Sequence, residues 1–337
     1  MSADAEVSAD AGTRAGAGTR AGAGTRAVVP CRACLSGEDL DWLGGRSVSV
    51  ALDLPTTVEV FPATAGGTDR TDAGSWAAEV WAFLRDRLPA LPDGPPPAVR
   101  VGSDAPAASG LSSSTALIVA LFEAYLAAHR AAGDVPVGTV TRWAYEFEFA
   151  VFNGGGMDQV AVVEGGALLL EGRTTGLPAI LERTAFPADW TLLVVDSATA
   201  KSTGDHIRTV RAQVAADDPA LAEYMAGTDA TSEEVWKALV GRDLTGLGNA
   251  MSRAHVAMRD LQRMSTPLLE DLRELALARV GLPLKLSGAG GGGALVGVCP
   301  AEEAEATAAR LRSALHGRHP DVRVLPARAA GRRTPGA

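Results

Sequence analysis

The sequence has few cysteines, no excess of positive charge and no long apolar run. Only three cysteines, Cys31, Cys34 and Cys299, occur in 337 residues, which argues against a disulfide framework and predicts a reducing compartment, the cytoplasm. The longest apolar stretches, such as 116–121, fall far short of the roughly 20 residues that a membrane span needs. Acidic residues outnumber basic ones by 40 to 31, so neither nucleic acid nor a membrane surface is expected as a partner.

Familiar cofactor motifs are missing as well. The Walker A pattern G-x-x-x-x-G-K-[ST] occurs nowhere in the chain, so a standard P-loop fold is not expected. The run 288–293 formally satisfies G-x-G-x-x-G, but strand-like residues 294–298 follow it where a dinucleotide site needs a helix. Cys31 and Cys34 form a C-x-x-C without the second pair or nearby histidine that would complete a zinc site.

The remaining composition predicts a globular enzyme of two domains. A chain of this length with 47% hydrophobic residues can supply two cores. Residues 1–27 carry repeated A-G-A-G-T-R units and are predicted to be a disordered low-complexity tail. Strand-like and helical segments alternate on both sides of a boundary near Pro187, which predicts domains at 28–187 and 188–326 and a second disordered tail at 327–337.

One glycine- and serine-rich segment is a candidate phosphate site. Residues 109–116, S-G-L-S-S-S-T-A, stand between a short strand-like segment at 98–102 and a long apolar helix predicted over 113–131. The backbone N–H groups of such a loop and the N-terminus of the helix attract phosphate. Glycine permits close approach of the backbone, and serine hydroxyls can donate to phosphate oxygens or bind Mg²⁺. An ordinary serine N-cap on a core helix is the alternative.

Three motifs in this order resemble the signatures of the GHMP kinases, the family of galactokinase, homoserine kinase, mevalonate kinase and phosphomevalonate kinase. Residues 110–116 resemble the second signature, and 285–293, K-L-S-G-A-G-G-G-G, resemble the third. Residues 30–45, P-C-R-A-C-L-S-G-E-D-L-D-W-L-G-G, are similar to the galactokinase opening P-G-R-V-N-L-I-G-E-H-T-D-Y-N-G-G. The resemblance covers roughly 28–325. It implies an α+β fold of two domains, the first with a left-handed βαβ unit and the second ferredoxin-like, with ATP and acceptor between them.

The resemblance also implies the catalytic residues. Residues 146–159 are similar to the galactokinase stretch E-x-x-F-A-x…G-I-M-D-Q, which implies Asp158 beside the reacting hydroxyl and Glu146 on Mg²⁺. Arg32 would neutralise charge on the phosphoryl group or hold Asp158 ionised. The predicted ATP- and phosphate-binding residues are Gly110, Leu111, Ser112, Ser113, Ser114, Thr115, Gly288, Ala289, Gly290 and Gly291. Ser114 is the predicted ligand of Mg²⁺, with Ser113 as its rival.

An acidic turn is the candidate acceptor site. The predicted acceptor-binding residues are Glu38, Asp39, Asp41, Gly155 and Asp158. Carboxylates can accept several O–H donors, and the family's sugar kinases have acids at the Glu38 and Asp41 positions. Asp39 stands where galactokinase has a histidine, which argues against galactose itself. A solvated acidic turn is the alternative interpretation.

Together these motifs predict an ATP- and Mg²⁺-dependent sugar kinase. Its reaction would place the γ-phosphate on the anomeric O1 of a hexose, a uronic acid, or a heptose- or octose-type sugar or sugar phosphate. Its only partner would be a small sugar or polyol, and the chain would be a monomer or homodimer. Two alternatives stay open. The first is a mevalonate kinase-like enzyme, because residues 251–286 look more like mevalonate kinases and heptose-phosphate kinases, and Lys201 could meet an anionic group. The second is a non-catalytic, galactokinase-like sugar sensor.

Overall fold

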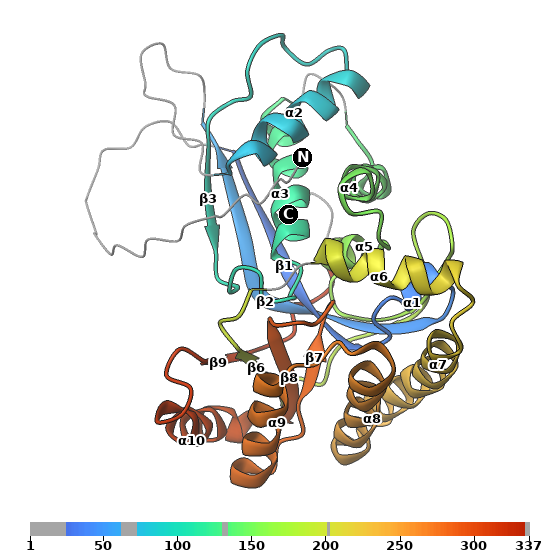
Figure 1. Ribbon diagram of the computed structural model, residues 1–337. Coiled ribbons are helices and arrows are strands. Elements are labelled where there is room, and N and C mark those ends of the chain that lie inside the picture. Colours follow the sequence, from blue (N-terminus) through green and yellow to red (C-terminus); the bar gives the residue numbers. More distant parts are fainter. Residues whose placement is uncertain (1–24, 62–72, 130–133, 201–202, 334–337) are drawn as a thin grey trace, which may run out of the picture.

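The computed structural model describes residues 25–61, 73–129, 134–200 and 203–333, which form two parts that are each built on an antiparallel sheet (Figure 1). The strands are β1 (Thr25–Ser36), β2 (Arg46–Val60), β3 (Val99–Ser103), β4 (Ala167–Glu171), β5 (Ala179–Thr184), β6 (Trp190–Asp196), β7 (Lys285–Ser287), β8 (Ala294–Pro300) and β9 (Arg323–Ala327). The helices are α1 (Leu40–Leu43), α2 (Ser75–Arg87), α3 (Ser113–Ala128), α4 (Val137–Phe152), α5 (Met157–Glu164), α6 (Thr203–Ala215), α7 (Pro219–Val240), α8 (Leu244–Gln262), α9 (Pro267–Val280), the short 3₁₀ helix η2 (Ala301–Glu303) and α10 (Ala304–His316).

The first sheet is organised around the long strand β2. Its strand order is β1-β2-β4-β5, and β3 also pairs with β2. Pro30 and Pro55 face each other in the β1–β2 ladder, and the register shifts directly after Pro30, because proline has no N–H to give to a ladder. One half of β2 therefore pairs with β3 and the other half with β4.

Helix α3 covers one face of this sheet, and α2 and α4 lie outside it (Figure 1). Helix α3 is apolar on nearly all of its faces, as expected of a fully buried helix. Strand β1 is buried continuously from Ala27 except at Val28. A strand that is buried on both faces must have further neighbours besides α3, and these are α5, α7, α8 and β7.

The second sheet has the order β7-β8-β6-β9. Strand β6 comes first in the chain and lies beside both β8 and β9, which is the order of a ferredoxin-like β-α-β-β-α-β unit. Helices α9 and α10 pack together on this unit, while α7 and α8 form a helical pair that also touches the first sheet. The predicted α+β fold of two domains is therefore confirmed.

The apolar core runs across both parts. The connection between β5 and β6 contains the predicted boundary near Pro187. Nevertheless, one cluster of buried side chains joins β1, β2 and α3 to Val194 and Val296 of the second sheet and to Trp236 of α7. The two sheets thus share a core, which fixes the loops between them.

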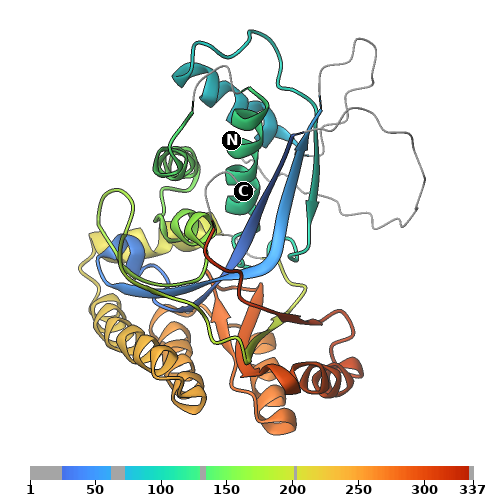
Figure 2. The same cartoon turned by 180° about the vertical axis from the view of Figure 1, so that it is seen from behind.

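The C-terminal residues return to the first sheet after β9. The Ala330 N–H donates to Ala51 O at 2.8 Å, and Arg333 pairs with Glu123 at 2.7 Å. Figure 2 shows this segment in dark red between the two parts. The disordered tail predicted for 327–337 is therefore wrong for 327–333, because backbone hydrogen bonds and an ion pair hold these residues in place.

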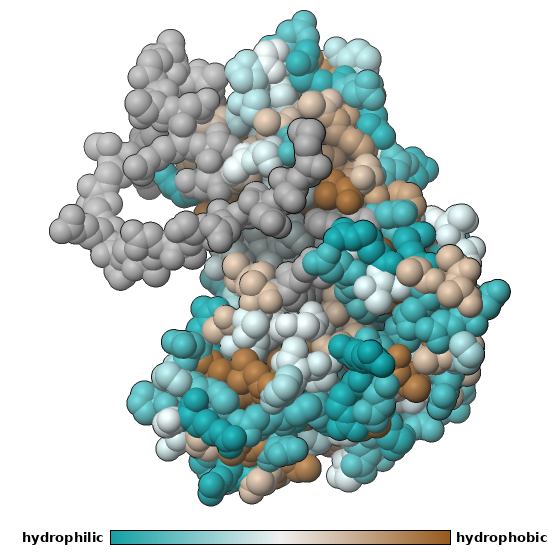
Figure 3. All heavy atoms as spheres, in the orientation of Figure 1, coloured by the Kyte–Doolittle hydropathy of each residue, from teal (hydrophilic) through white to brown (hydrophobic). Residues whose placement is uncertain are grey.

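The predicted N-terminal tail lies mostly outside the described residues, although 25–27 belong to β1. Within the described ranges, no helix combines the length and the apolar character that crossing a membrane requires. The face drawn in Figure 3 is mainly hydrophilic, with small apolar areas. The large apolar side chains that are exposed are spread over seven elements, with two of them on α4: Val28, Phe149, Val151, Leu181, Val214, Val240, Val256 and Leu277.

Candidate active site

Arg32 and Asp158 form the centre of the site. Arg32 extends from β1, and Asp158 lies in the first turn of α5; their side chains meet at 2.7 Å through Nε and 2.5 Å through Nη2. Arg32 Nη1 also donates to Gly110 O at 2.7 Å. Burial alone would lower the pKa of Arg32, but the Asp158 carboxylate raises it above its ordinary value. The guanidinium therefore joins the predicted base to the first glycine loop, and both are held in one orientation.

Asp41 lies next to this pair. It belongs to the short helix α1 and is buried, and its carboxylate accepts the Met157 N–H at 2.9 Å. A side chain on Gly155 would overlap the Asp41 carboxylate, so only glycine fits there. Burial raises the pKa of Asp41 to about 7; the Met157 hydrogen bond opposes this rise, and the charges of Asp158 and Asp39 add to it. The structure thus brings together three of the predicted carboxylates and Gly155.

Asp39 has a partner that sequence reasoning missed. Its backbone is left-handed, with φ of 66°, and its Oδ2 lies 2.7 Å from Nε2 of His206 on α6. Trp42 donates its indole N–H to the other oxygen at 3.3 Å. No signal in the sequence links His206 to a residue so distant along the chain. The structure places an imidazole beside the acidic turn, although Asp39 replaces the galactokinase histidine.

The structure does not bring Glu146 to this cluster. Glu146 lies on the outer side of α4, is 40% exposed and pairs with Arg87 at 3.1 Å. Glu148, two residues later, is buried; it accepts Thr115 Oγ1 at 3.0 Å and contacts Gln159 Nε2. Two residues along a helix turn a side chain to nearly the opposite side, so Glu148 faces the phosphate loop and Glu146 faces solvent.

Glu148 carried a detectable signal in the sequence. It continues the buried stripe of α4 that contains Val140, Ala144 and Phe147, a spacing typical of a core-facing helix surface. A carboxylate in such a stripe needs a partner. Burial raises the pKa of Glu148 to about 8, the Asp158 charge adds to this rise, and hydrogen bonds from Thr115 and Gln159 oppose it. The resemblance in motif spacing pointed to Glu146 instead.

The first glycine loop begins α3. Gly110 and Ser112 have positive φ of 81° and 61°, and α3 starts at Ser113. Ser112 Oγ is buried and has no hydrogen-bond partner among the described residues. Ser113 is partly exposed and Ser114 is exposed, while Thr115 is bound to Glu148. Free N–H groups of a first helical turn, together with these hydroxyls, suit a phosphate.

The second glycine loop packs directly against the first. Five of its residues, Gly288 and Gly290 to Gly293, have positive φ. The Ala294 N–H donates to Ser109 O at 2.7 Å, and a side chain on Gly293 would place its Cβ 2.7 Å from the same oxygen. Gly290 lies against Met264 O in the same way. Two motifs that are far apart in sequence therefore form one surface.

Glu38 has a partner outside the acidic turn. It is buried, and its Oε1 pairs with Lys285 of β7, while its Oε2 is buried without a hydrogen-bond partner among the described residues. Lys201, proposed to meet an anionic group, lies outside the described residues. The three acids of the turn thus differ: Asp41 lies next to Asp158, Asp39 binds His206 and Glu38 binds Lys285.

The residues of the site suit a magnesium ion that arrives with a nucleotide. No three histidine, cysteine or acidic side chains gather as a ready-made metal site in the described part of the chain. Mg²⁺ keeps several waters and takes few protein ligands besides substrate phosphates. Glu148 is a carboxylate whose pKa is raised chiefly by burial, and a bound cation would stabilise its charged form. Glu148 and the Ser114 hydroxyl are the groups that would hold it.

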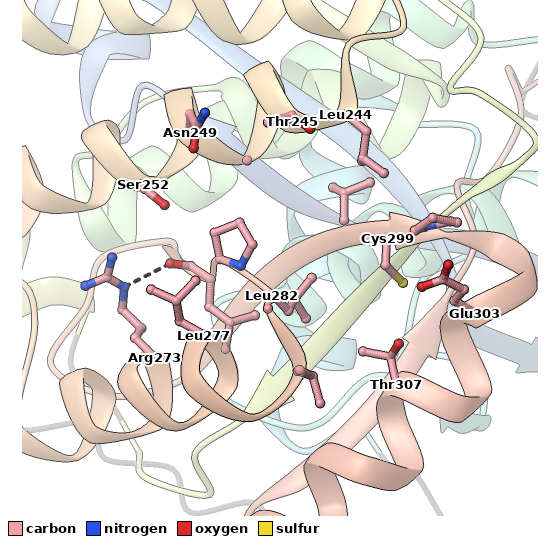
Figure 4. A pocket seen from close by; sticks show the side chains of 17 residues that line it. Leu244, Thr245, Asn249, Ser252, Arg273, Leu277, Leu282, Cys299, Glu303 and Thr307 are labelled. Carbon is pink, nitrogen blue, oxygen red and sulfur yellow. Dashed lines mark hydrogen bonds between the residues drawn. The ribbon is translucent and has the colours of Figure 1, made fainter.

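A cavity lies apart from this cluster. It measures about 420 Å³ and opens between α8, α9 and β8 (Figure 4). Arg273 on one side donates to Leu284 O at 2.9 Å, and Cys299, Glu303 and Thr307 lie on the other. It shares no residue with the cluster around Asp158, so it has no part in the arrangement described above.

Comparison with known proteins identifies the family. The model of the GHMP kinases N terminal domain matches residues 76–166, and the model of the GHMP kinases C terminal matches 236–317; together they span just over half of the chain. A galactokinase of Mycobacterium bovis (strain BCG / Pasteur 1173P2) is 28% identical over 338 residues, covering 85% of this chain and 92% of the relative. A galactokinase of Haemophilus influenzae (strain PittGG) is 24% identical, covering 82% and 85%.

Two solved structures share the fold. Lactococcus lactis galactokinase complexed with galactose superposes with a TM-score of 0.72 at 16% identity, covering 91% of this chain and 95% of that one. L. major mevalonate kinase in complex with R-mevalonate gives a TM-score of 0.71 at 18% identity, covering 91% and 96%. With the motifs, the two domain matches and this fold in agreement, the chain belongs to the GHMP kinase family and is an ATP-dependent kinase.

Proposed function

We propose that this kinase transfers the γ-phosphate of ATP to a sugar hydroxyl, the anomeric O1. The observation that carries the proposal is the group of Asp158, Arg32 and Asp41 with the glycine loop at Gly110. Phosphoryl transfer needs the phosphate held, its charge neutralised and the attacking alcohol oriented. This group offers a separate residue for each task beside one loop.

Asp158 orients the acceptor hydroxyl and accepts its proton. Arg32 holds the Asp158 carboxylate by two N–H groups and supplies positive charge beside Gly110, where the γ-phosphate would lie. The N–H groups at the start of α3 and the Ser112 hydroxyl bind phosphate oxygens. Ser114 and Glu148 would hold Mg²⁺, which would neutralise charge on the phosphates, with Glu148 in the place first assigned to Glu146.

The charge around the acceptor position favours a neutral sugar. Three carboxylates, Asp39, Asp41 and Asp158, lie together there, whereas Arg32 is already paired with Asp158. Carboxylates accept hydrogen bonds from hydroxyls and repel anions. A neutral polyhydroxylated acceptor therefore fits better than a uronic acid, a sugar phosphate or mevalonate, which carry negative charge.

The test is to measure ATP consumption with neutral sugars, uronic acids, sugar phosphates and mevalonate, and to locate the new phosphate by phosphorus NMR. A phosphate on the anomeric oxygen of a neutral sugar is the expected result. Turnover with mevalonate alone would overturn the proposal. Binding of a sugar without turnover would instead support a sensor, an outcome that the intact group of Arg32, Glu148 and Asp158 argues against.

A further inference from the structure

Gln159 has no part in the proposed reaction, yet it is buried beside the residues that carry it. It follows Asp158 in the first turn of α5 and is 2% exposed. Its Nε2 contacts Glu148 Oε2, whereas its Oε1 is buried without a hydrogen-bond partner among the described residues. A buried polar group without a partner costs free energy. Within the described ranges, the contact with Glu148 is therefore the hydrogen bond that compensates this amide for its burial.

Glu148 is held by two donors that come from different helices. Its Oε1 accepts the Thr115 hydroxyl of α3 at 3.0 Å, and its Oε2 accepts the Gln159 amide of α5. An ionised carboxylate only accepts hydrogen bonds, so the N–H end of the amide has to face it. Each oxygen of Glu148 thus has one donor, and the loss of either donor would leave the carboxylate free to turn on that side.

Gln159 also connects Glu148 to the predicted base. Asp158 and Gln159 are neighbours on α5, and the Met157 N–H before them is bound to Asp41 at 2.9 Å. Successive side chains of a helix point about 100° apart, so Asp158 can face the arginine on β1 while Gln159 faces α4. Helix α5 packs against both α3 and α4 (Figure 1). One helical turn therefore sets the position of the base and, through Gln159, that of the buried carboxylate.

We propose that Gln159 is a positioning residue, which holds the Glu148 carboxylate toward the first glycine loop in the orientation that binds Mg²⁺ together with a nucleotide. The inference rests on the proposed function, which assigns Glu148 to Mg²⁺. Gln159 acts through Glu148 and makes no contact of its own with the nucleotide or the acceptor. Groups that orient a metal-binding side chain contribute about 10- to 100-fold to metal affinity or activity, so the loss of Gln159 should be measurable.

The experiment measures how much Mg²⁺ strengthens the binding of a non-hydrolysable ATP analogue. Isothermal titration gives the affinity with Mg²⁺ and, separately, with EDTA in its place, and the ratio of the two affinities is compared between wild type and Gln159→Met. Methionine resembles glutamine in size but donates no hydrogen bond to Glu148. We expect the ratio to fall about tenfold, while the affinity in EDTA stays unchanged because the N–H groups of α3 remain.

Gln213 on α6 provides the matched control. Its Nε2 donates to Asp218 at 3.1 Å, and its Oε1 is also buried without a hydrogen-bond partner among the described residues. Gln213→Met therefore removes a similar amide away from the site and should keep the wild-type ratio. Gln159→Asn guards against misfolding of Gln159→Met: it keeps the amide but shortens the side chain by one methylene, so the contact with Glu148 is lost and the ratio should fall as well.

A double variant tests whether the effect passes through Glu148. Glu148→Gln alone should lower the ratio, and adding Gln159→Met to it should lower the ratio further by less than about twofold, because no carboxylate is left to orient. The same tenfold loss in both backgrounds would overturn the proposal. An unchanged ratio in folded Gln159 variants would do so too, including the case of a structural role that weakens both affinities equally.

The titration also separates this inference from the proposed function. A normal ratio in Glu148→Gln would remove Glu148 from the metal site and would overturn both. A lowered ratio in Glu148→Gln with a normal ratio in the Gln159 variants would overturn the positioning role alone. Because the titration needs no acceptor, the outcome of the sugar panel leaves this test intact.

Discussion

The two glycine loops of this kinase pack against each other but differ in what they contribute to the site. The first, around Gly110, leads into α3 and is surrounded by chemical groups: Arg32 binds its carbonyl, and Thr115 at its end binds Glu148. The second, 288–293, lies between two strands and offers only backbone, with positive φ at five residues. One loop therefore carries the chemistry, and the other supplies shape by fitting tightly against Ser109 O.

This difference indicates how each loop fails. Residues beside the first loop can change while the protein stays folded, so their loss should appear in turnover. Residues in and under the second loop fill tight backbone positions, so their loss should appear in stability and nucleotide affinity.

The largest effect is expected at Asp158. Asp158→Ala removes the group that orients the hydroxyl and accepts its proton, and general-base catalysis contributes about 10²- to 10⁴-fold. We expect kcat to fall about a thousandfold, while affinity for the ATP analogue stays within error of wild type. Steady-state rates and titration measure the two quantities. Normal turnover in this variant would falsify the assignment of the base.

Acid stability should depend on His255, which supports the second loop. Its Nδ1 accepts the Leu286 N–H at 3.0 Å and its Nε2 lies 2.7 Å from Glu270. Burial lowers the pKa of His255 to about 4, from an ordinary value of 6.5. Between these pH values the imidazole is protonated in the unfolded chain and neutral in the folded chain. The free energy of unfolding therefore decreases as the pH falls from 6.5 to 4, by about 3 kcal/mol.

His255→Asn provides the comparison, because asparagine does not titrate in this range and can still accept the Leu286 N–H. Denaturant unfolding at pH 7, 5.5 and 4 should give a smaller loss of unfolding free energy in the variant than in wild type. An equal loss in both proteins would show that another group causes the acid sensitivity. The lowered pKa of Glu270, about 2, affects stability only below its ordinary value of 4.5.

Glu148 should matter for catalysis and Glu146 should not. Glu148→Gln keeps the shape beside Thr115 but removes the charge proposed to hold Mg²⁺, and loss of a positioned metal contact should reduce kcat/KM by about a hundredfold. Glu146→Gln, on the exposed side of the same helix, is the matched control and should stay near wild type. Rates measured over a range of Mg²⁺ concentrations check this. The opposite ranking of the two variants would restore the assignment made from motif spacing.

The smallest effect separates two glycines of the second loop. Gly293→Ala forces a side chain into a left-handed residue whose Cβ would lie 2.7 Å from Ser109 O, whereas Gly291→Ala meets open space at a similar φ of 76°. The conformation alone costs about 1 kcal/mol, and the contact should raise the cost at Gly293 to about 2 kcal/mol. Thermal unfolding with and without MgADP measures both. Equal losses of stability in the two variants would mean that the close approach of the two loops does not contribute to the free energy of unfolding.

Much of the fold followed from local sequence. The apolar helix after Ser112, the strand-like segments around it and the ferredoxin-like order of the second half are set by periodicity, punctuation and motif resemblance. The return of 328–333 to the first sheet was missed because its partner, Ala51, lies in a strand far away in the chain. A short polar segment gives no local sign that it will pair with such a strand.

Motifs in the sequence predicted which residues belong to the site, but they predicted the orientation of individual side chains less well. The structure brings Arg32, Asp158 and Asp41 together. Glu146 was assigned from its separation from Asp158, and the face of the helix was not considered. Glu38 was grouped with Asp41 because the family's sugar kinases have acids at both positions; in the structure, Glu38 pairs with Lys285.

The return of the C-terminal residues also bears on how the protein is made. Ala51 and Gly166 bind their last backbone partner only at Ala330, and Arg333 reaches back to Val28 O at 3.1 Å. These residues follow every strand of the first sheet in the chain, so they leave the ribosome after those strands, and the sheet stays incomplete until they emerge. A chain cut after β9 would leave an open strand edge at Ala51, which pairs with Arg32 in the β1–β2 ladder.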